Sequence, residues 1–196
     1  MAENPSLLRQ EMEMTLQAVP ITTDRRQDRV AGLAMSERRF YQAILRAFPE
    51  FGGPPDHAWL RAEAPQHGVN LDAVLTRLEQ RDLIVRDPTT GVITVAYPFS
   101  LRPTRHQVEL EGGQSVYAMC AIDALGIPFM LGCPARIVST DPIRGEPIRV
   151  AVRADEVQWD PAEAVVLVGC VGGTGPAAET CCGFVNFFRS VESAEA

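Results

Sequence analysis

The 196-residue chain contains no lysine, so all 18 of its basic residues are arginine. It also lacks any apolar run approaching the roughly 18 residues that a membrane-spanning helix needs. Residues 1–28 are polar and mixed in charge, without the apolar stretch of a secretion signal. These absences predict a cytoplasmic protein with no membrane partner.

The number and the spacing of the cysteines argue against two common uses, a disulfide framework and a structural zinc site. The chain has five cysteines, an odd number that argues against a closed disulfide framework and suits a reducing compartment. A structural zinc site needs closely spaced pairs such as Cys-x₂-Cys. No such pair occurs among the five, which are Cys120, Cys133, Cys170, Cys181 and Cys182.

The first half of the chain has the pattern of three helices and a hairpin. We expect a helix from Ser36, its cap, to Pro49, a second helix after Asp56, and a third capped by Asn70. Residues 83–85 and 92–95 flank a Pro-Thr-Thr-Gly turn and are predicted to pair as strands. Three helices followed by a two-stranded wing indicate a winged-helix-like unit.

A winged helix suggests DNA binding, with the third helix as the recognition helix. The charge argues against nucleic acid as a partner. The whole chain carries a net charge of −7, and residues 36–98 hold seven arginines against eight acidic residues. Phosphate contacts need a basic face. A structural or substrate-covering role is therefore favoured for this unit.

The second half is rich in predicted strands and has one principal helix. After a linker at 98–103, strands are expected at 106–110, 136–139, 148–152, 165–168 and 183–188. The glycine-rich stretch 169–176 lacks the Gly-Lys-Ser/Thr ending of a phosphate-binding loop and is interpreted as a surface loop. The fold class is therefore predicted to be α+β. We divide the chain into a leader or tail, 1–34, a winged-helix-like domain, 35–98, and a strand-rich domain, 99–196.

The principal helix is predicted over residues 116–128, closing at Gly126 and Pro128, and it carries the most suggestive chemistry. Cys120 and Asp123 are three residues apart, so on a helix they share one face. A thiolate is a nucleophile and a soft-metal ligand, and a carboxyl group can carry a proton. The alternative is a buried structural cysteine beside a solvent-facing aspartate.

The second concentration of thiols is the adjacent pair Cys181 and Cys182, before an apolar strand. Neighbouring residues of a strand face opposite sides, so only one of the two can point at a given site. Cys133 and Cys170 are interpreted as packing residues. No catalytic role is assigned to the histidines, which are scattered at His57, His67 and His106.

Two segments together carry a family resemblance. Residues 117–125 read Tyr-Ala-Met-Cys-Ala-Ile-Asp-Ala-Leu, and residues 182–188 read Cys-Gly-Phe-Val-Asn-Phe-Phe. They resemble the Tyr-Ala-x-Cys-Ala-x-Asp-x-Leu and Cys-x-x-Val-x-Phe-Phe segments of the alkylmercury (organomercurial) lyases. The likeness includes residues 135–139 and spans residues 36–190. Either motif alone is weak, whereas both in this order are specific.

The resemblance implies an enzyme that cleaves carbon–mercury bonds by protonolysis, with residues 99–196 as its catalytic domain. Cys120 and Cys182 would bind the mercury of an organomercurial substrate, and Asp123 would deliver a proton to carbon. The Phe-Phe register selects Cys182 over Cys181 as the second ligand. No organic cofactor is implied. Inorganic Hg(II) would remain on Cys120, Cys182 and Asp123 until cellular thiols or a mercuric reductase accept it.

The resemblance also implies candidate walls for the alkyl or aryl group, namely Phe129, Met130, Phe184, Phe187 and Phe188. Three features depart from the family pattern: Asn186 stands where histidine is common, Cys181 is an extra thiol that could compete for the metal, and the chain ends soon after the last motif. Two alternatives therefore stay open, a lyase-fold homologue recruited to other thiol-dependent chemistry and a winged-helix, metal-responsive regulator. The sequence leaves monomer and homodimer equally open.

Overall fold

The computed structural model describes residues 29–153, 156–169 and 175–196. The description that follows concerns the unit Leu33–Ala196. Most of the predicted leader and most of the glycine-rich loop lie outside the described residues. Within the described ranges, no helix is long and apolar enough to cross a membrane.

The three predicted helices are present as α3 (Met35–Phe51), α4 (His57–Gln66) and α5 (Leu71–Gln80). The expected caps of the last two are confirmed, since Asp56 accepts from the Trp59 N–H at 2.7 Å and Asn70 from the Ala73 N–H at 3.0 Å. The predicted start of α3 at Ser36 was wrong. Its N-cap is Ala34, whose N–H donates to the Glu37 carboxylate at 2.8 Å, and Ser36 lies inside the helix.

The predicted hairpin is confirmed as β1 (Ile84–Arg86) paired antiparallel with β2 (Ile93–Ala96). The predicted linker at 98–103 was wrong, because Phe99–Ser100 forms β3, which pairs with both β2 and β5 (Ser115–Ala118). The wing is thereby joined to an eight-stranded sheet of order β1-β2-β3-β5-β4-β6-β7-β8. A short strand inside a linker has too few residues to leave a hydrophobic pattern.

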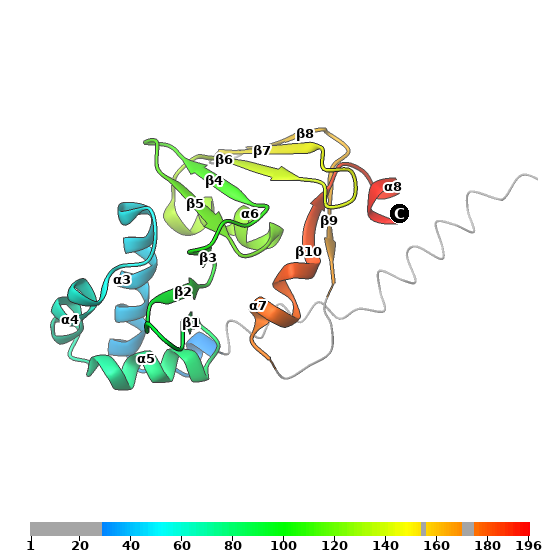
Figure 1. Ribbon diagram of the computed structural model, residues 1–196. Helices are drawn as coiled ribbons and strands as arrows, with labels where there is room; N and C mark the ends of the chain where they lie inside the picture. The colour runs from blue at the N-terminus through cyan, green and yellow to red at the C-terminus, as the bar shows by residue number, and fades with distance from the viewer. Residues whose placement is uncertain (1–28, 154–155, 170–174) are drawn as a thin grey trace, which may run out of the picture. The chain divides into compact units, whose positions relative to one another are not determined.

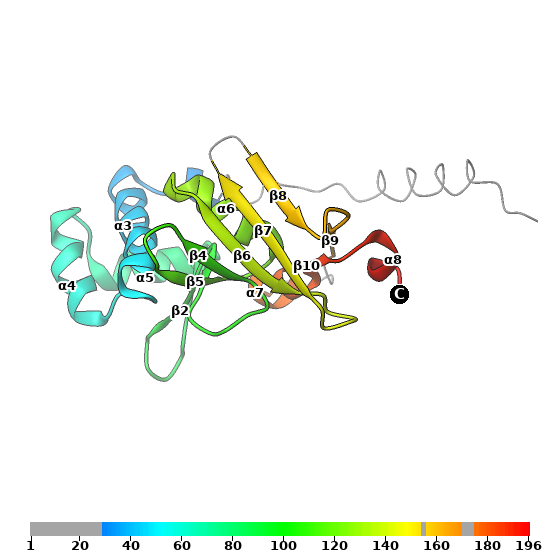
Figure 2. The ribbon, with the colours of Figure 1, turned by 90° about the horizontal axis from the view of Figure 1, so that it is seen from above.

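The remaining strands of this sheet are antiparallel and lie side by side in Figure 2. They are β4 (Gln107–Leu110), β6 (Ala135–Thr140), β7 (Pro147–Arg153) and β8 (Glu156–Asp160). The predicted strands at 106–110, 136–139 and 148–152 are therefore confirmed, whereas the sequence did not indicate β8. None of the five positions of β8 is buried, so the strand lacks an apolar face that a sequence pattern could reveal.

A second, two-stranded sheet pairs β9 (Val165–Val168) with β10 (Val185–Phe188). Helix α7 (Ala177–Thr180) and the 3₁₀ helix η1 (Cys182–Phe184) precede β10, and α8 (Val191–Ala194) follows it. The predicted strand at 183–188 thus begins two residues later, after η1. Figure 1 shows the segment from α7 to β10 as one continuous stretch, with η1 between the two labelled elements.

The principal helix is α6 (Ala121–Leu131), and its predicted bounds, 116–128, were wrong at both ends. Residues Ser115–Ala118 belong to β5, and the helix continues through Gly126 and Pro128 to Gly132, which adopts a left-handed conformation. Pro128 removes one i→i−4 hydrogen bond but does not end the helix. Helix α6 contacts β4 and β5 of the large sheet and β10 of the small sheet.

The helical half and the sheet share one core. Phe48 of α3 stacks on Phe99 of β3 with ring centroids 5.1 Å apart, and both side chains are almost completely buried. The α+β fold class is confirmed, with helices gathered around β1 and β2 at one end of the sheet (Figure 1). The three-part division of the chain stays a prediction.

Candidate active site

Cys120 lies at the junction where β5 gives way to α6. Several hydrogen bonds hold the preceding residues in place: the Ala118 N–H donates to the His106 carbonyl at 2.9 Å and the Met119 N–H to the Pro98 carbonyl at 3.0 Å. The Thr104 hydroxyl donates to the Ala118 carbonyl at 2.6 Å. The backbone that carries the Cys120 thiol is therefore tied to two neighbouring segments.

The Cys120 side chain serves as the N-cap of α6. Its sulfur accepts a hydrogen bond from the Asp123 N–H at 3.4 Å and donates one to Asp123 Oδ2 at 3.1 Å. Sequence spacing suggested that the two residues share a helix face, whereas they meet through capping geometry at the first turn. Both side chains are buried, with 3% and 2% of their surfaces exposed. Asp123 therefore does not face solvent.

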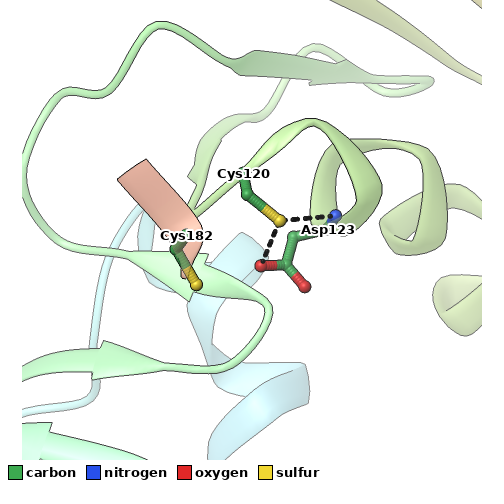
Figure 3. A group of neighbouring side chains, drawn as sticks. All are labelled: Cys120, Asp123 and Cys182. Atoms are coloured by element: carbon green, nitrogen blue, oxygen red, sulfur yellow. Dashed lines mark hydrogen bonds between the residues drawn. The ribbon is translucent and has the colours of Figure 1, made fainter. Parts of the chain in front are cut away.

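Cys182 lies beside Cys120 and Asp123, although it comes from a later segment of the chain. It opens η1, is buried, and offers its sulfur to the group formed with Cys120 and Asp123. One ligand atom from each of the three residues lies within 4.8 Å of the others. Figure 3 shows the three side chains converging from the start of α6 and from η1. Two sulfurs and a carboxylate thus lie close enough together to bind one metal ion.

The environment keeps the Cys120 thiol protonated in the absence of a ligand. Its hydrogen bond with Cys182, its burial and the negative charge of Asp123 all raise the pKa of Cys120 far above the ordinary thiol value. Its place at a helix N-terminus acts in the opposite direction, because the Asp123 N–H favours the thiolate. A strongly bound soft cation can take the place of this proton on the sulfur.

The alkylmercury lyase family model, MerB, matches residues 99–196, which is half of the chain and includes all three converging residues. This chain belongs to the alkylmercury lyase family. Family membership and the curated relatives indicate an enzyme that cleaves carbon–mercury bonds.

Individual alkylmercury lyases show how far the likeness extends. The Staphylococcus epidermidis enzyme is 28% identical over 165 residues, which cover 84% of this chain and 73% of that protein. The Streptomyces lividans enzyme is 35% identical over 92 residues, 46% of this chain and 42% of that protein. The match thus spans under half of the Streptomyces enzyme.

A solved structure extends the likeness to three dimensions. The crystal structure of the mercury-bound form of MerB2 superimposes with a TM-score of 0.66 and 29% sequence identity, covering 86% of this chain and 81% of that chain. At this identity, the structural match supports the family assignment as well as the fold.

Within this alkylmercury lyase family member, the other cysteines stand apart from the converging group. Cys181 is half-buried and accepts a hydrogen bond from the Thr180 hydroxyl at 3.9 Å. Cys133 is half-buried after the end of α6, where burial and then the charge of Glu111 raise its pKa. Cys170 lies outside the described residues. The role of Cys182 as the second ligand stays a prediction, although its sulfur is the one that joins Cys120 and Asp123.

The histidines lie outside the group as well. His57 is exposed, and His67 pairs with Glu63 at 2.9 Å on the helical side. His106 is buried, with Nδ1 at 2.9 Å from the Ser139 hydroxyl and its ring edge-on to Phe187. The His106 ring therefore packs in the core against β10.

The five predicted wall residues divide into two sets. Phe187 and Phe188 are buried, and the Phe187 ring also packs against Trp159 at a centroid distance of 5.8 Å. Phe129, Met130 and Phe184 are exposed by 63%, 44% and 45%. Exposed apolar side chains are available to a substituent, whereas fully buried ones are committed to packing. Whether any of them contacts substrate stays a prediction.

Sequence reasoning missed two residues that hold the segment leading to Cys182. Asp82 and Tyr97 form hydrogen bonds to the start of α7, 95 and 81 residues further along the chain. A separation of this length leaves no periodic or spacing signal in the sequence. Only the folded structure shows that these residues contact α7. Asn186, where the family commonly has histidine, donates to the Gly183 carbonyl at 3.0 Å and so holds the turn of η1.

Proposed function

We propose that this protein cleaves organomercurials by protonolysis, with Cys120 and Cys182 binding mercury and Asp123 transferring the proton to carbon. The observation that carries the proposal is the meeting of two buried sulfurs and a buried carboxylate within 4.8 Å. Mercury is a soft metal, and soft thiolates are its preferred ligands. A carbon–mercury bond resists hydrolysis because its leaving group would be a carbanion.

The first proton to move is the one on Cys120. The thiol already donates to Asp123 Oδ2 at 3.1 Å, so the carboxylate is placed to accept this proton as a mercury–sulfur bond forms. The same step releases the thiolate that carried the organomercurial into the site. Asp123 is then a buried carboxylic acid beside the metal.

The second step breaks the carbon–mercury bond. When Cys182 adds the second mercury–sulfur bond, its thiol proton passes to the thiolate released in the first step. Two cysteine thiolates then donate electron density to the metal and make the bound carbon more basic. The Asp123 proton moves to that carbon, and the bonding pair becomes the new carbon–hydrogen bond. The balance is one organomercurial thiolate plus two cysteine thiols, giving a hydrocarbon, a free thiol and Hg(II) on both cysteines.

The surroundings suit this chemistry because all three side chains are buried. Exclusion of water strengthens each electrostatic interaction and limits loss of the proton to solvent. The reaction requires no organic cofactor. Cytoplasmic thiols or a mercuric reductase would take the Hg(II) product, and a reducing compartment would keep both cysteines available.

The test is release of hydrocarbon from methylmercury or phenylmercury in excess thiol, measured as methane or benzene by gas chromatography. Asp123→Asn keeps the shape of the side chain but cannot carry the proton. We expect it to retain bound mercury through desalting and to lose hydrocarbon release by roughly 100-fold or more. Cys120→Ser should lose both properties.

Cys133→Ser is the matched control, because it removes a thiol outside the converging group and should leave turnover unchanged. Full turnover by Cys120→Ser would contradict the assigned roles. Absence of hydrocarbon from the wild-type protein would instead support a lyase-fold homologue recruited to other thiol-dependent chemistry.

A further inference from the structure

The segment that brings Cys182 to the site begins at helix α7, and the first turn of this helix is bound by the wing. The Ala177 N–H donates to Asp82 Oδ2 at 3.0 Å, and the Ala178 N–H donates to the Tyr97 hydroxyl at 2.7 Å. The first N–H groups of a helix have no partner within the helix itself. Asp82 and Tyr97 supply those partners from the other half of the domain.

These two side chains, here named the Asp82–Tyr97 clamp, are also fixed to each other. The Tyr97 hydroxyl donates to Asp82 Oδ1 at 3.2 Å, and the Tyr97 N–H donates to the Leu83 carbonyl at 3.2 Å. The buried Tyr41 hydroxyl donates to the Tyr97 carbonyl at 2.8 Å. Asp82 has a positive φ of 50°, a conformation in which aspartate and asparagine are enriched. The clamp is therefore a rigid feature of the wing.

A short backbone path connects the clamp to the sulfur. The Cys181 N–H donates to the Ala177 carbonyl at 3.0 Å, and the Phe184 N–H donates to the Cys181 carbonyl at 2.9 Å. Helix α7 and η1 thus form two consecutive turns, and Cys182 is the first residue of the second turn. Burial, followed by the neighbouring Asp82 and Cys182, raises the pKa of Tyr97, so the phenol stays a hydrogen-bonding hydroxyl.

We propose that the Asp82–Tyr97 clamp positions Cys182 against Cys120, so that the winged-helix-like half sets the separation of the two mercury-binding sulfurs. This inference rests on the proposed role of Cys182 as the second ligand. The first sulfur is placed by β5 and α6, whereas the second depends on a short helix of four residues. A helix this short is not stable by itself and takes its position from its contacts. Asp82 and Tyr97 are positioning residues in this scheme.

The test compares two clamp variants with a matched control. Tyr97→Phe keeps the ring but removes the acceptor for the Ala178 N–H, and Asp82→Asn preserves the backbone conformation while removing one of two acceptor oxygens. Ser193→Ala is the control, because it also removes a buried hydroxyl that donates to an aspartate, at 2.6 Å from Asp141 Oδ2. The control bond lies outside the clamp and the converging group.

Two readouts separate positioning from general stability. The first is kcat for benzene release from phenylmercury, since a displacement of about 1 Å in a reacting group can cost ~100-fold. The second is X-ray absorption of the protein with one equivalent of Hg(II), which counts coordinating sulfurs. We expect Tyr97→Phe to lower kcat by about 10-fold or more and to lose one protein sulfur, with a smaller effect for Asp82→Asn. Ser193→Ala should match the wild type in both readouts.

The possible results distinguish a failure of the clamp inference from a failure of the proposed lyase mechanism. If Cys182→Ser loses turnover while both clamp variants match Ser193→Ala in kcat and sulfur count, the clamp inference is overturned and the lyase mechanism stands. If Cys182→Ser turns over at the wild-type rate, the assignment of the second ligand fails first. A loss of kcat and of one sulfur in the clamp variants, absent from the control, supports the inference.

Discussion

His106 should make the stability of this protein sensitive to mild acid. Burial lowers the pKa of His106 to about 4, and the nearby positive charge of Arg105 acts in the same direction, while a hydrogen bond with Asn186 opposes them. The imidazole is only 2% exposed. Protonation would therefore place an ion inside the core between β4 and β10.

The sign and size of this change in folding stability follow from proton linkage. Between pH 6.5, the ordinary histidine value, and about 4, the unfolded chain binds a proton at His106 that the folded chain does not. Stability is therefore full above pH 6.5 and is lost as the pH falls towards 4. At about 1.4 kcal/mol for each pKa unit, the loss reaches roughly 3 kcal/mol. Below pH 4 both states are protonated and this group contributes no further change.

The assay is urea unfolding followed by tryptophan fluorescence at a series of pH values from 7 to 4. His106→Gln removes the titrating ring and should flatten the acid loss by roughly 3 kcal/mol, whatever its effect on stability at pH 7. His57→Gln, which removes an exposed histidine, is the control and should keep the wild-type slope. An acid loss in His106→Gln equal to that of the wild type would refute the reasoning.

Two further predictions follow. Burial by itself would raise the pKa of Asp141, but hydrogen bonds from the backbone N–H groups of Arg189, Arg144 and Ile143 and from the Ser193 hydroxyl lower it to about 2. Asp141→Asn should therefore cost about 2 kcal/mol in urea unfolding at pH 7, a difference that disappears as the pH falls from 3.8 towards 2. A constant difference across that range would contradict this assignment. Cys181→Ser should release benzene at the wild-type rate, because its sulfur lies outside the converging group; a loss comparable to that of Cys182→Ser would show that the wrong thiol was assigned.

Local patterns predicted much of the secondary structure, since their causes lie within a few residues. Asp56 and Asn70 cap the helices they were expected to cap, and the wing hairpin pairs as expected. The errors arose where contacts between residues far apart in the sequence determine the secondary structure. Residues 99–100 become a strand only because β2 and β5 lie on either side. Helix α6 starts after Cys120 because the preceding residues pair with β3 and β4.

The sequence by itself determined the chemistry available to this protein: two cysteine segments, one carrying an aspartate three residues on, in an order shared with the alkylmercury lyases. The resemblance favoured Cys182 over Cys181, but only the tertiary structure brings the Cys182 sulfur beside Cys120, because the directions of these adjacent residues depend on how α7 and η1 are held. Adjacent residues have the same local sequence context but different directions in space. That direction comes from hydrogen bonds to Asp82 and Tyr97, far away along the chain.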